Sequence, residues 1–191
     1  MDYKAAKKFL MTKLKEELLP VYSYHGIHHT LDVLKVCKQL CKAEKISEKD
    51  TVLLQTAVLL HDIGFTVSAQ DHEKTGCKIA RKILPRFYYE IEDIEKICGM
   101  IMATKIPQTP RTPAEMVICD ADLDYLGRKD FFAIGKTLYE ELKALGMIET
   151  EKQWNTMQLN FLKQHRYHTP TTIKRREARK QKHLLYIKNL L

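Results

Sequence analysis

Apolar residues recur every three to four positions along almost the whole chain, which is the spacing of one face of an α-helix. No stretch shows the sustained alternation of apolar and polar residues that a half-buried strand requires. The pattern therefore predicts an all-α fold, a bundle of about eight or nine helices. We expect these helices at residues 2–20, 27–42, 47–64, 71–85, 89–102, 112–127, 130–145, from 150 onwards and 169–191.

Start signals support several of these helices. Thr112, Pro113 and Glu115 give the strongest one, a capping residue followed by Pro at the first helical position and Glu at the third. We also expect Asp71 to cap the fourth helix. The third helix is apolar on nearly every side, which predicts that it is buried at the centre of the bundle.

The composition fits one globular domain. The chain has 191 residues and is 45% hydrophobic, enough for a core of its own, and it has neither the bias of a disordered chain nor an internal repeat or linker. We expect a single domain over residues 1–191, with the motifs below in residues 24–127 and the C-terminal helices, 129–191, packed on that part.

No apolar run approaches the roughly 20 residues that cross a bilayer, and the first turns are charged throughout, unlike a signal peptide. Five cysteines occur without any CxxC pair, mostly in apolar stretches, which predicts reduced, buried thiols. We therefore expect a cytoplasmic protein that does not interact with a membrane.

The net charge of +8 belongs to one segment. Residues 163–191 contain nine Lys or Arg and one Glu, and the rest of the chain is neutral. A basic segment of this kind can bind nucleic acid, but few aromatic residues are interleaved with the charges. We interpret it as the solvated face of a docked last helix and do not expect a nucleic-acid partner.

Polar residues occupy three places where the helical pattern calls for apolar ones, and burying them requires partners. One group opens the second expected helix, and the other two directly follow apolar runs of the third and sixth. The three groups are His25, His28 and His29; His61 and Asp62; and Asp120, Asp122 and Asp124.

Neutral imidazoles and carboxylates together are ligands for divalent cations, from iron, manganese, cobalt, nickel and zinc to magnesium. Taken singly, each group also fits a simpler role: polar residues at a helix cap, a satisfied ion pair in the core, or a helix end in water. At this point either His28 or His29, and either Asp120 or Asp122, is a candidate ligand.

The order of the three groups resembles the HD superfamily of metal-dependent phosphohydrolases, which are all-helical. YHGIHHTLDV is similar to the first motif of that family, ALLHDIGF to its His-Asp doublet and DADLDYLG to its final Asp motif. The resemblance covers residues 24–127. It implies one divalent metal ion held by His29, His61, Asp62 and Asp122, with His28 and Asp120 as the adjacent alternatives.

The resemblance further implies hydrolysis of a phosphate ester or anhydride of a small substrate, expected to be a nucleotide, by metal-activated water that Asp62 orients. In the cyclic-nucleotide phosphodiesterase branch, the His that opens the first motif protonates the leaving oxygen. His25 matches it, although Gly26 stands where that branch usually has Asn.

Three further residues are candidate substrate contacts: His72, which follows the doublet, Lys105 and Arg128. Two other functions stay open, a nucleotide- or metal-sensing module without turnover and a nucleic-acid hydrolase. The oligomeric state is open too, and a homo-oligomer is compatible with the sequence.

Overall fold

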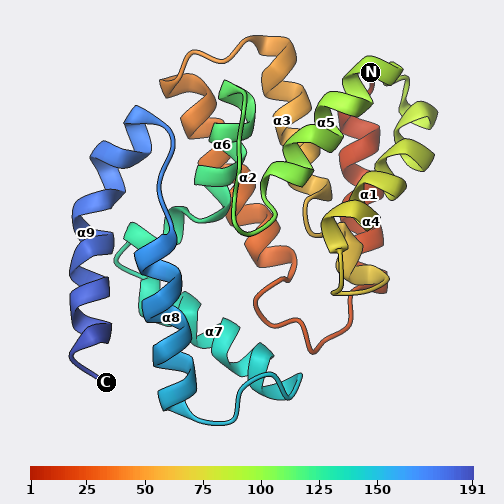
Figure 1. Ribbon diagram of the computed structural model, residues 1–191. Coiled ribbons are helices and arrows are strands. Elements are labelled where there is room, and N and C mark those ends of the chain that lie inside the picture. The colour runs from red at the N-terminus through yellow and green to blue at the C-terminus, as the bar shows by residue number, and fades with distance from the viewer.

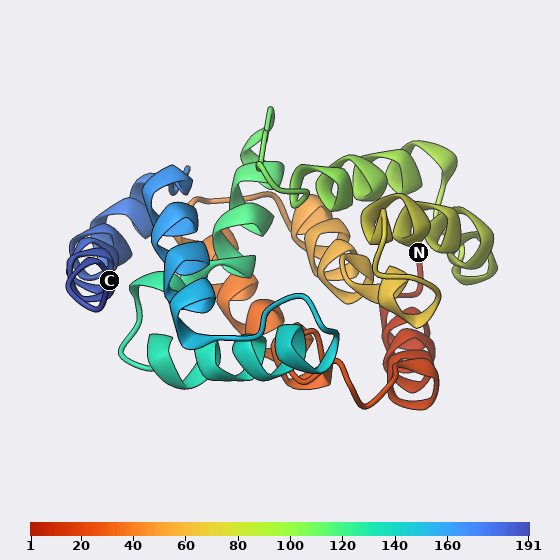
Figure 2. The ribbon, with the colours of Figure 1, turned by 60° about the horizontal axis from the view of Figure 1, so that its bottom comes forward.

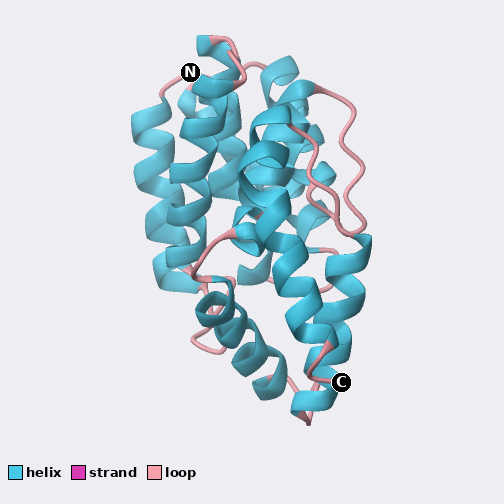
Figure 3. Ribbon diagram, turned by 90° about the vertical axis from the view of Figure 1, so that its left-hand side faces the viewer, coloured by secondary structure: helices cyan, strands magenta, loops and turns pink.

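Every regular element of the protein is a helix. The computed structural model describes all residues, 1–191, and contains no strand (Figure 3). The all-α prediction is therefore confirmed, with nine α-helices and three short 3₁₀ helices. Their bounds are α1 Tyr3–Glu17, α2 Ile27–Ala43, α3 Glu48–Leu60, η1 Ile63–Thr66, α4 His72–Ile83, η2 Leu84–Phe87, α5 Ile91–Ala103, α6 Pro113–Asp122, η3 Asp124–Gly127, α7 Phe131–Ala144, α8 Glu151–Gln164 and α9 Pro170–Lys188.

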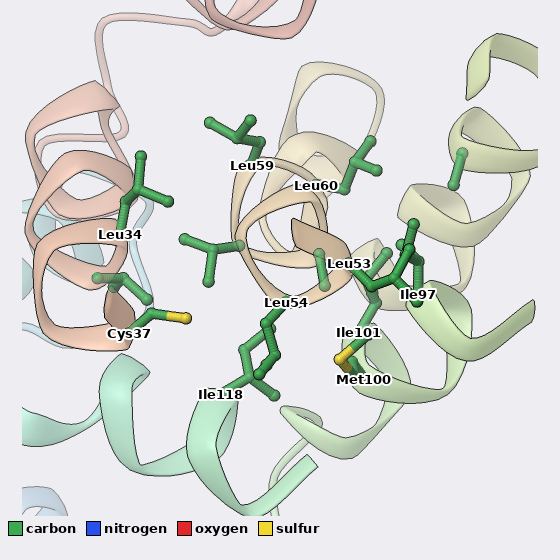
Figure 4. Close-up of a cluster of buried hydrophobic side chains, with 14 of the residues drawn as sticks. Leu34, Cys37, Leu53, Leu54, Leu59, Leu60, Ile97, Met100, Ile101 and Ile118 are labelled. Carbon is green, nitrogen blue, oxygen red and sulfur yellow. The ribbon is translucent and has the colours of Figure 1, made fainter. Parts of the chain in front are cut away.

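Helix α3 lies at the centre of the larger part of the molecule, as its apolar sequence predicted. It packs against α1, α2, α5 and α6, and α4 covers α5 on the outside (Figure 1). Figure 4 shows its leucines between the side chains of three neighbouring helices. The labelled residues are Leu53, Leu54, Leu59 and Leu60 of α3, Leu34 and Cys37 of α2, Ile97, Met100 and Ile101 of α5, and Ile118 of α6.

A second, smaller apolar cluster lies at the other end of the molecule. It joins η3, α7, α8 and α9, which lie side by side at the left of Figure 2 and lower left of Figure 1. Phe131 and Ile187 are among its buried residues, and Tyr24, from the loop before α2, also belongs to it. The C-terminal helices thus pack on the motif-bearing part of the chain, and the single-domain assignment stays a prediction.

Two of the expected helices end earlier than the pattern indicates. α3 ends at Leu60, and the chain turns through His61 and Asp62 into η1. α6 ends at Asp122, and η3 follows. In both places the apolar run continues past the helix end because the turn itself is buried, so hydrophobic spacing alone cannot mark the boundary.

The helix starts agree with the sequence in one case and differ in another. The capping box of Thr112 and Glu115 is present, with both of its hydrogen bonds. Asp71 occupies the N-cap position of α4 as expected, but it has a left-handed backbone (φ 51°) and its side chain makes no capping hydrogen bond. Its carboxylate instead accepts a hydrogen bond from Lys105.

All five cysteines are free and buried, as predicted. In the last helix, Ile173 and Leu185 are exposed while Lys180 and His183 are buried. The Lys180 ammonium donates to the carbonyl oxygen of His165 at 3.0 Å and pairs with Glu177 at 2.9 Å. A buried lysine with these partners keeps its charge satisfied.

Asp120 connects α6 to the start of α9. It is fully buried, and its carboxylate accepts from the backbone N–H groups of His168 and Thr169 (2.8 Å each) and from the Thr169 hydroxyl (2.6 Å). We expect Asp120→Ala to lower the free energy of unfolding by about 3 kcal/mol, because it leaves these donors buried without an acceptor.

Urea unfolding measures this loss as a lower midpoint at an unchanged slope. Glu16→Ala, at an exposed position of α1, is the control and should change stability by less than about 0.5 kcal/mol. A loss no larger than that of the control would contradict the anchoring role of Asp120.

Candidate active site

Four side chains from three separate parts of the chain meet where helices end. His29 lies in the first turn of α2, His61 and Asp62 directly follow α3, and Asp122 is the last residue of α6. α2 packs against both α3 and α6, which brings these positions together. All four residues are largely buried.

The polar atoms of these side chains face one another at short range. The Nε2 atoms of His29 and His61 are 3.3 Å apart. Oδ1 of Asp122 lies 3.0 Å from the first nitrogen and 3.5 Å from the second, and Oδ2 of Asp62 lies at 3.5 Å and 3.1 Å from them. One ligand atom each of His29, His61 and Asp122 falls within 4.8 Å of the others, close enough to hold one metal ion.

Two observations fit a divalent cation at this point. Nδ1 of His61 lies 2.7 Å from the carbonyl oxygen of Val58, which only accepts, so Nδ1 carries a proton, and in the neutral ring that binds a cation the lone pair is on Nε2, which faces the cluster. Oδ2 of Asp62 is buried and has no hydrogen-bond partner. A buried carboxylate oxygen and an imidazole lone pair aimed at one point are what a cation satisfies.

The electrostatics of the cluster are strongly coupled. Burial by itself lowers the pKa of His61, but the carboxylates of Asp62 and Asp122 outweigh it and raise that pKa well above its usual value. Burial likewise raises the pKa of Asp122, but hydrogen bonds with His29 and His61 hold it at about 2. Burial also raises the pKa of Asp62, but the neighbouring histidines outweigh it and lower that pKa, so both carboxylates stay ionised and favour a cation between them.

The two alternative ligands lie elsewhere. His28 is exposed and contributes to none of the contacts of the cluster. Asp120 points to the start of α9, where its carboxylate is occupied by the three donors described above. The structure thus brings His29 and Asp122 together with the doublet and keeps His28 and Asp120 apart from it.

His25 lies beside the cluster and is held by a residue that the sequence analysis missed. Nδ1 of His25 is 2.5 Å from Oε1 of Glu141, and Oε2 of the same carboxylate accepts from the backbone N–H groups of Tyr24 (2.7 Å) and His25 (3.1 Å). Glu141 is 1% exposed and belongs to α7. This carboxylate fixes the ring orientation and leaves Nε2 of His25 free.

The pKa values of this pair move in opposite directions. Burial lowers the pKa of His25, but the hydrogen bond to Glu141 outweighs it and raises that pKa above its usual value. Burial raises the pKa of Glu141, but His25 outweighs it and lowers that pKa. One signal could have revealed Glu141: it follows Phe131, Ile134 and Leu138 on the apolar stripe of its helix.

His72 completes the polar side of the site, and Gly64 makes its position possible. Nε2 of His72 lies 3.6 Å from Oδ1 of Asp62, and its ring stacks on Phe65 at 4.2 Å, as the ring of His25 does at 4.3 Å. A Cβ atom at Gly64 would overlap the backbone carbonyl of His72. The glycine therefore lets α4 begin directly against η1.

The two expected cationic substrate contacts do not lie in the site. Lys105 pairs with Asp71 at 2.8 Å, and Arg128 pairs with Asp32 at 2.7 Å and with Asp130 at 2.7 Å. Neither residue lines the cavity next to the cluster. In this structure acidic neighbours engage both side chains, and their role as substrate contacts stays a prediction.

A cavity of about 210 Å³ adjoins the cluster. His25, Asp62, His72 and Asp122 line one end of it, and apolar residues of η3, α7 and α8 line the other. The site therefore combines a candidate cation position, a histidine held by a carboxylate, and a partly open cavity for a small molecule.

The HD domain family profile matches residues 26–124, which include all four clustered ligands. The match covers more than half of the chain, so this chain belongs to the HD domain family, a family of metal-dependent phosphohydrolases. The expected resemblance is confirmed at that level.

Relatives by sequence are more distant. The chain is 29% identical over 106 residues to a bifunctional uridylyltransferase/uridylyl-removing enzyme of Rhodopseudomonas palustris; the match covers 56% of this chain and 10% of that protein. It is 30% identical over 76 residues to an uncharacterized protein of Clostridium beijerinckii, covering 38% of this chain and 48% of the other. The chain thus spans at most about half the length of these relatives.

Solved structures share the whole fold. A predicted HD superfamily hydrolase from an uncultured Thermotogales bacterium has a TM-score of 0.63 at 20% identity, covering 98% of this chain and 90% of that one. YpgQ of Bacillus subtilis, solved in complex with ADP, has 0.68 at 18%, covering 100% and 95%. A Lactobacillus plantarum protein has a TM-score of 0.66 at 16% identity, covering 99% of this chain and 92% of that one.

No helix of the present protein is long and apolar enough to span a bilayer.

Adjacent histidines provide a matched test of the metal cluster. We expect His29→Ala to weaken binding of Mn²⁺ by more than about a hundredfold, because it removes one ligand nitrogen, and His28→Ala to leave it nearly unchanged. Calorimetric titration of the metal-free protein measures both. Equal losses in the two variants, or a larger one in His28→Ala, would contradict the arrangement.

The close approach at Gly64 predicts a stability change of its own. Gly64→Ala should destabilise the protein by about 3 kcal/mol, because the backbone of His72 must move. Gly99→Ala, in the interior of α5 with only Oε1 of Glu115 at 3.4 Å, should be neutral or stabilising. Thermal unfolding of both variants checks the difference, and equal midpoints would exclude the tight contact.

Proposed function

We propose that this protein is a metal-dependent phosphohydrolase that cleaves a phosphate ester or anhydride of a small substrate, with a nucleotide as the expected substrate. The observation that carries the proposal is the meeting of His29, His61, Asp62 and Asp122 around an unpartnered carboxylate oxygen at one end of a cavity. Family membership supports the same reaction class.

In this proposal His29, His61, Asp62 and Asp122 hold one divalent ion. When bound, such an ion lowers the pKa of water and polarises a phosphoryl oxygen. The identity of the ion is open among iron, manganese, cobalt, nickel, zinc and magnesium, since imidazole and carboxylate ligands accept all of these. Asp62 also has a second oxygen, Oδ1, on the side of His72, where it can accept a hydrogen bond from the attacking water.

His25 is the proposed proton donor to the leaving oxygen. It lines the cavity, and the hydrogen bond of Nδ1 to Glu141 leaves Nε2 to carry the proton that is transferred. Glu141 is a positioning residue, since it acts through His25. His72 lines the same end of the cavity and is positioned to donate a hydrogen bond to the phosphoryl group.

Two of the similar proteins support a nucleotide substrate. One relative is a uridylyl-removing enzyme, and one protein of similar fold was solved with ADP. We therefore keep a nucleotide as the proposed substrate. A location in the cytoplasm is also part of the proposal, and a homo-oligomer is compatible with it.

The first experiment is phosphate release from a panel of nucleotides and simple phosphate esters with Mn²⁺, Fe²⁺, Co²⁺, Ni²⁺, Zn²⁺ or Mg²⁺ added. We expect turnover that requires a metal and that disappears in His61→Ala and Asp122→Ala, since each removes a ligand. Asp122→Ala is paired with Asp120→Asn, which keeps the anchor of α9 nearly isosteric and should retain the activity.

Tight nucleotide binding without turnover under every metal would instead indicate a sensor. Activity restricted to RNA or DNA, and lost with rising salt, would indicate a nucleic-acid hydrolase that uses the basic last helix. Either result would replace the proposed function.

A general acid is recognised by its dependence on the leaving group. We expect His25→Gln to lower kcat by about a hundredfold or more on an alkyl phosphate and only slightly on p-nitrophenyl phosphate, whose leaving group needs no proton. Glu141→Gln should show the same selectivity with a smaller loss. Equal losses on both substrates would assign His25 and Glu141 a merely structural role.

A further inference from the structure

The cavity beside the metal cluster has two chemically different ends. The polar end carries His25, Asp62, His72, Glu73 and Asp122. The other end, here called the α7–α8 limb, is lined by Leu138 of α7 and by Trp154, Met157, Phe161 and Leu162 of α8. A ligand that fills the cavity must therefore present a polar group to one end and an apolar group to the other.

The charge of the lining limits how much phosphate the cavity accepts. No lysine or arginine is among its lining residues, while three carboxylates, those of Asp62, Glu73 and Asp122, are. Lys105 and Arg128 are engaged in ion pairs outside it. One divalent ion with two histidines can offset a single phosphoryl group, but a second or third would lie among carboxylates without a cationic partner.

The size of the cavity also favours a ligand with one ring and one phosphoryl group. An engineered apolar cavity of about 150 Å³ binds benzene. The present cavity of about 210 Å³ has room for one ring of that kind and for a phosphoryl group at the polar end. Met157 is 40% exposed, so the limb opens to solvent at the α8 side, and the remainder of a larger ligand can extend there.

We infer that the substrate of this site is a compound with one phosphoryl group whose adjoining part is a flat, largely apolar ring held in the α7–α8 limb, and that di- and triphosphates are poor substrates. The inference rests on the proposed function and narrows its substrate class. Trp154 and Phe161 supply the surfaces for the ring, and Gln158 is the one amide side chain of the limb that can hydrogen-bond a polar edge.

Matched substrates test the two parts of the inference. AMP should be hydrolysed with a kcat/KM at least about tenfold above that of ADP or ATP, and 2-phenylethyl phosphate at least about tenfold above glycerol 1-phosphate. The last two are both alkyl esters, so their leaving groups make similar demands on His25. Equal or reversed preferences in either pair would overturn the inference.

Trp154 gives a measure of binding that needs no turnover, because it is the sole tryptophan of the chain. With Zn²⁺-loaded protein, phenylphosphonate, which is not hydrolysed, should change the tryptophan fluorescence saturably, and methylphosphonate should bind at least about tenfold more weakly. Equal affinity for the two, or no fluorescence change with phenylphosphonate, would contradict a ring in the limb.

Two pairs of substitutions at half-buried positions of α8 test separately the binding of the ring and the exclusion of a second phosphate. Trp154→Ala should remove most of the preference for 2-phenylethyl phosphate, and Trp154→Phe should retain it. Gln158→Lys places a cation in the limb and should raise the ADP-to-AMP ratio of kcat/KM about fivefold, whereas Gln158→Leu should not. An unchanged ratio in Gln158→Lys would mean that missing cations are not what excludes a second phosphate.

The two levels of the proposal fail differently. Metal-dependent hydrolysis without any preference for a ring or for one phosphoryl group would contradict the inferred substrate class but still support the proposed phosphohydrolase function. Selective phenylphosphonate binding without hydrolysis of any substrate would retain the ligand class and overturn the catalytic function.

Discussion

Ionisable side chains are buried where three helices meet, and the free-energy cost of burying them constrains the rest of the structure. His29, His61, Asp62 and Asp122 are largely removed from water, and Oδ2 of Asp62 has no hydrogen-bond donor. Such a cluster is costly unless a cation compensates it. The packing of α2, α3 and α6 provides the stability that keeps these groups in place, and the large apolar cluster around α3 is the source of that stability.

The same constraint explains the arrangement around the site. Two buried carboxylates outside the cluster are satisfied by other donors: Asp120 by the start of α9, and Glu141 by His25 and two backbone amides. Each of these bonds joins segments that are far apart in the chain. Hydrogen bonding of buried acids therefore determines how the C-terminal helices sit against the motif-bearing part.

The sequence was sufficient for the all-α fold and the central α3, because helical spacing and an all-round apolar helix are local signals. It also placed the three polar groups, since histidines and aspartates interrupt apolar runs there. It could not show Glu141 beside His25, 116 residues away in the chain. It also could not show the ion pairs of Lys105 with Asp71 and of Arg128 with Asp32, because tertiary packing brings these residues together.

Asp120 and Asp122 lie two residues apart in the last turn of α6, and they face different parts of the molecule. The carboxylate of Asp120 accepts hydrogen bonds at the start of the basic terminal helix, and Asp122 belongs to the candidate metal cluster. The last turn of α6 is therefore a short link between the helix that carries the excess positive charge and the candidate metal cluster. The start of α9 and Asp122 are therefore connected through less than one turn of helix.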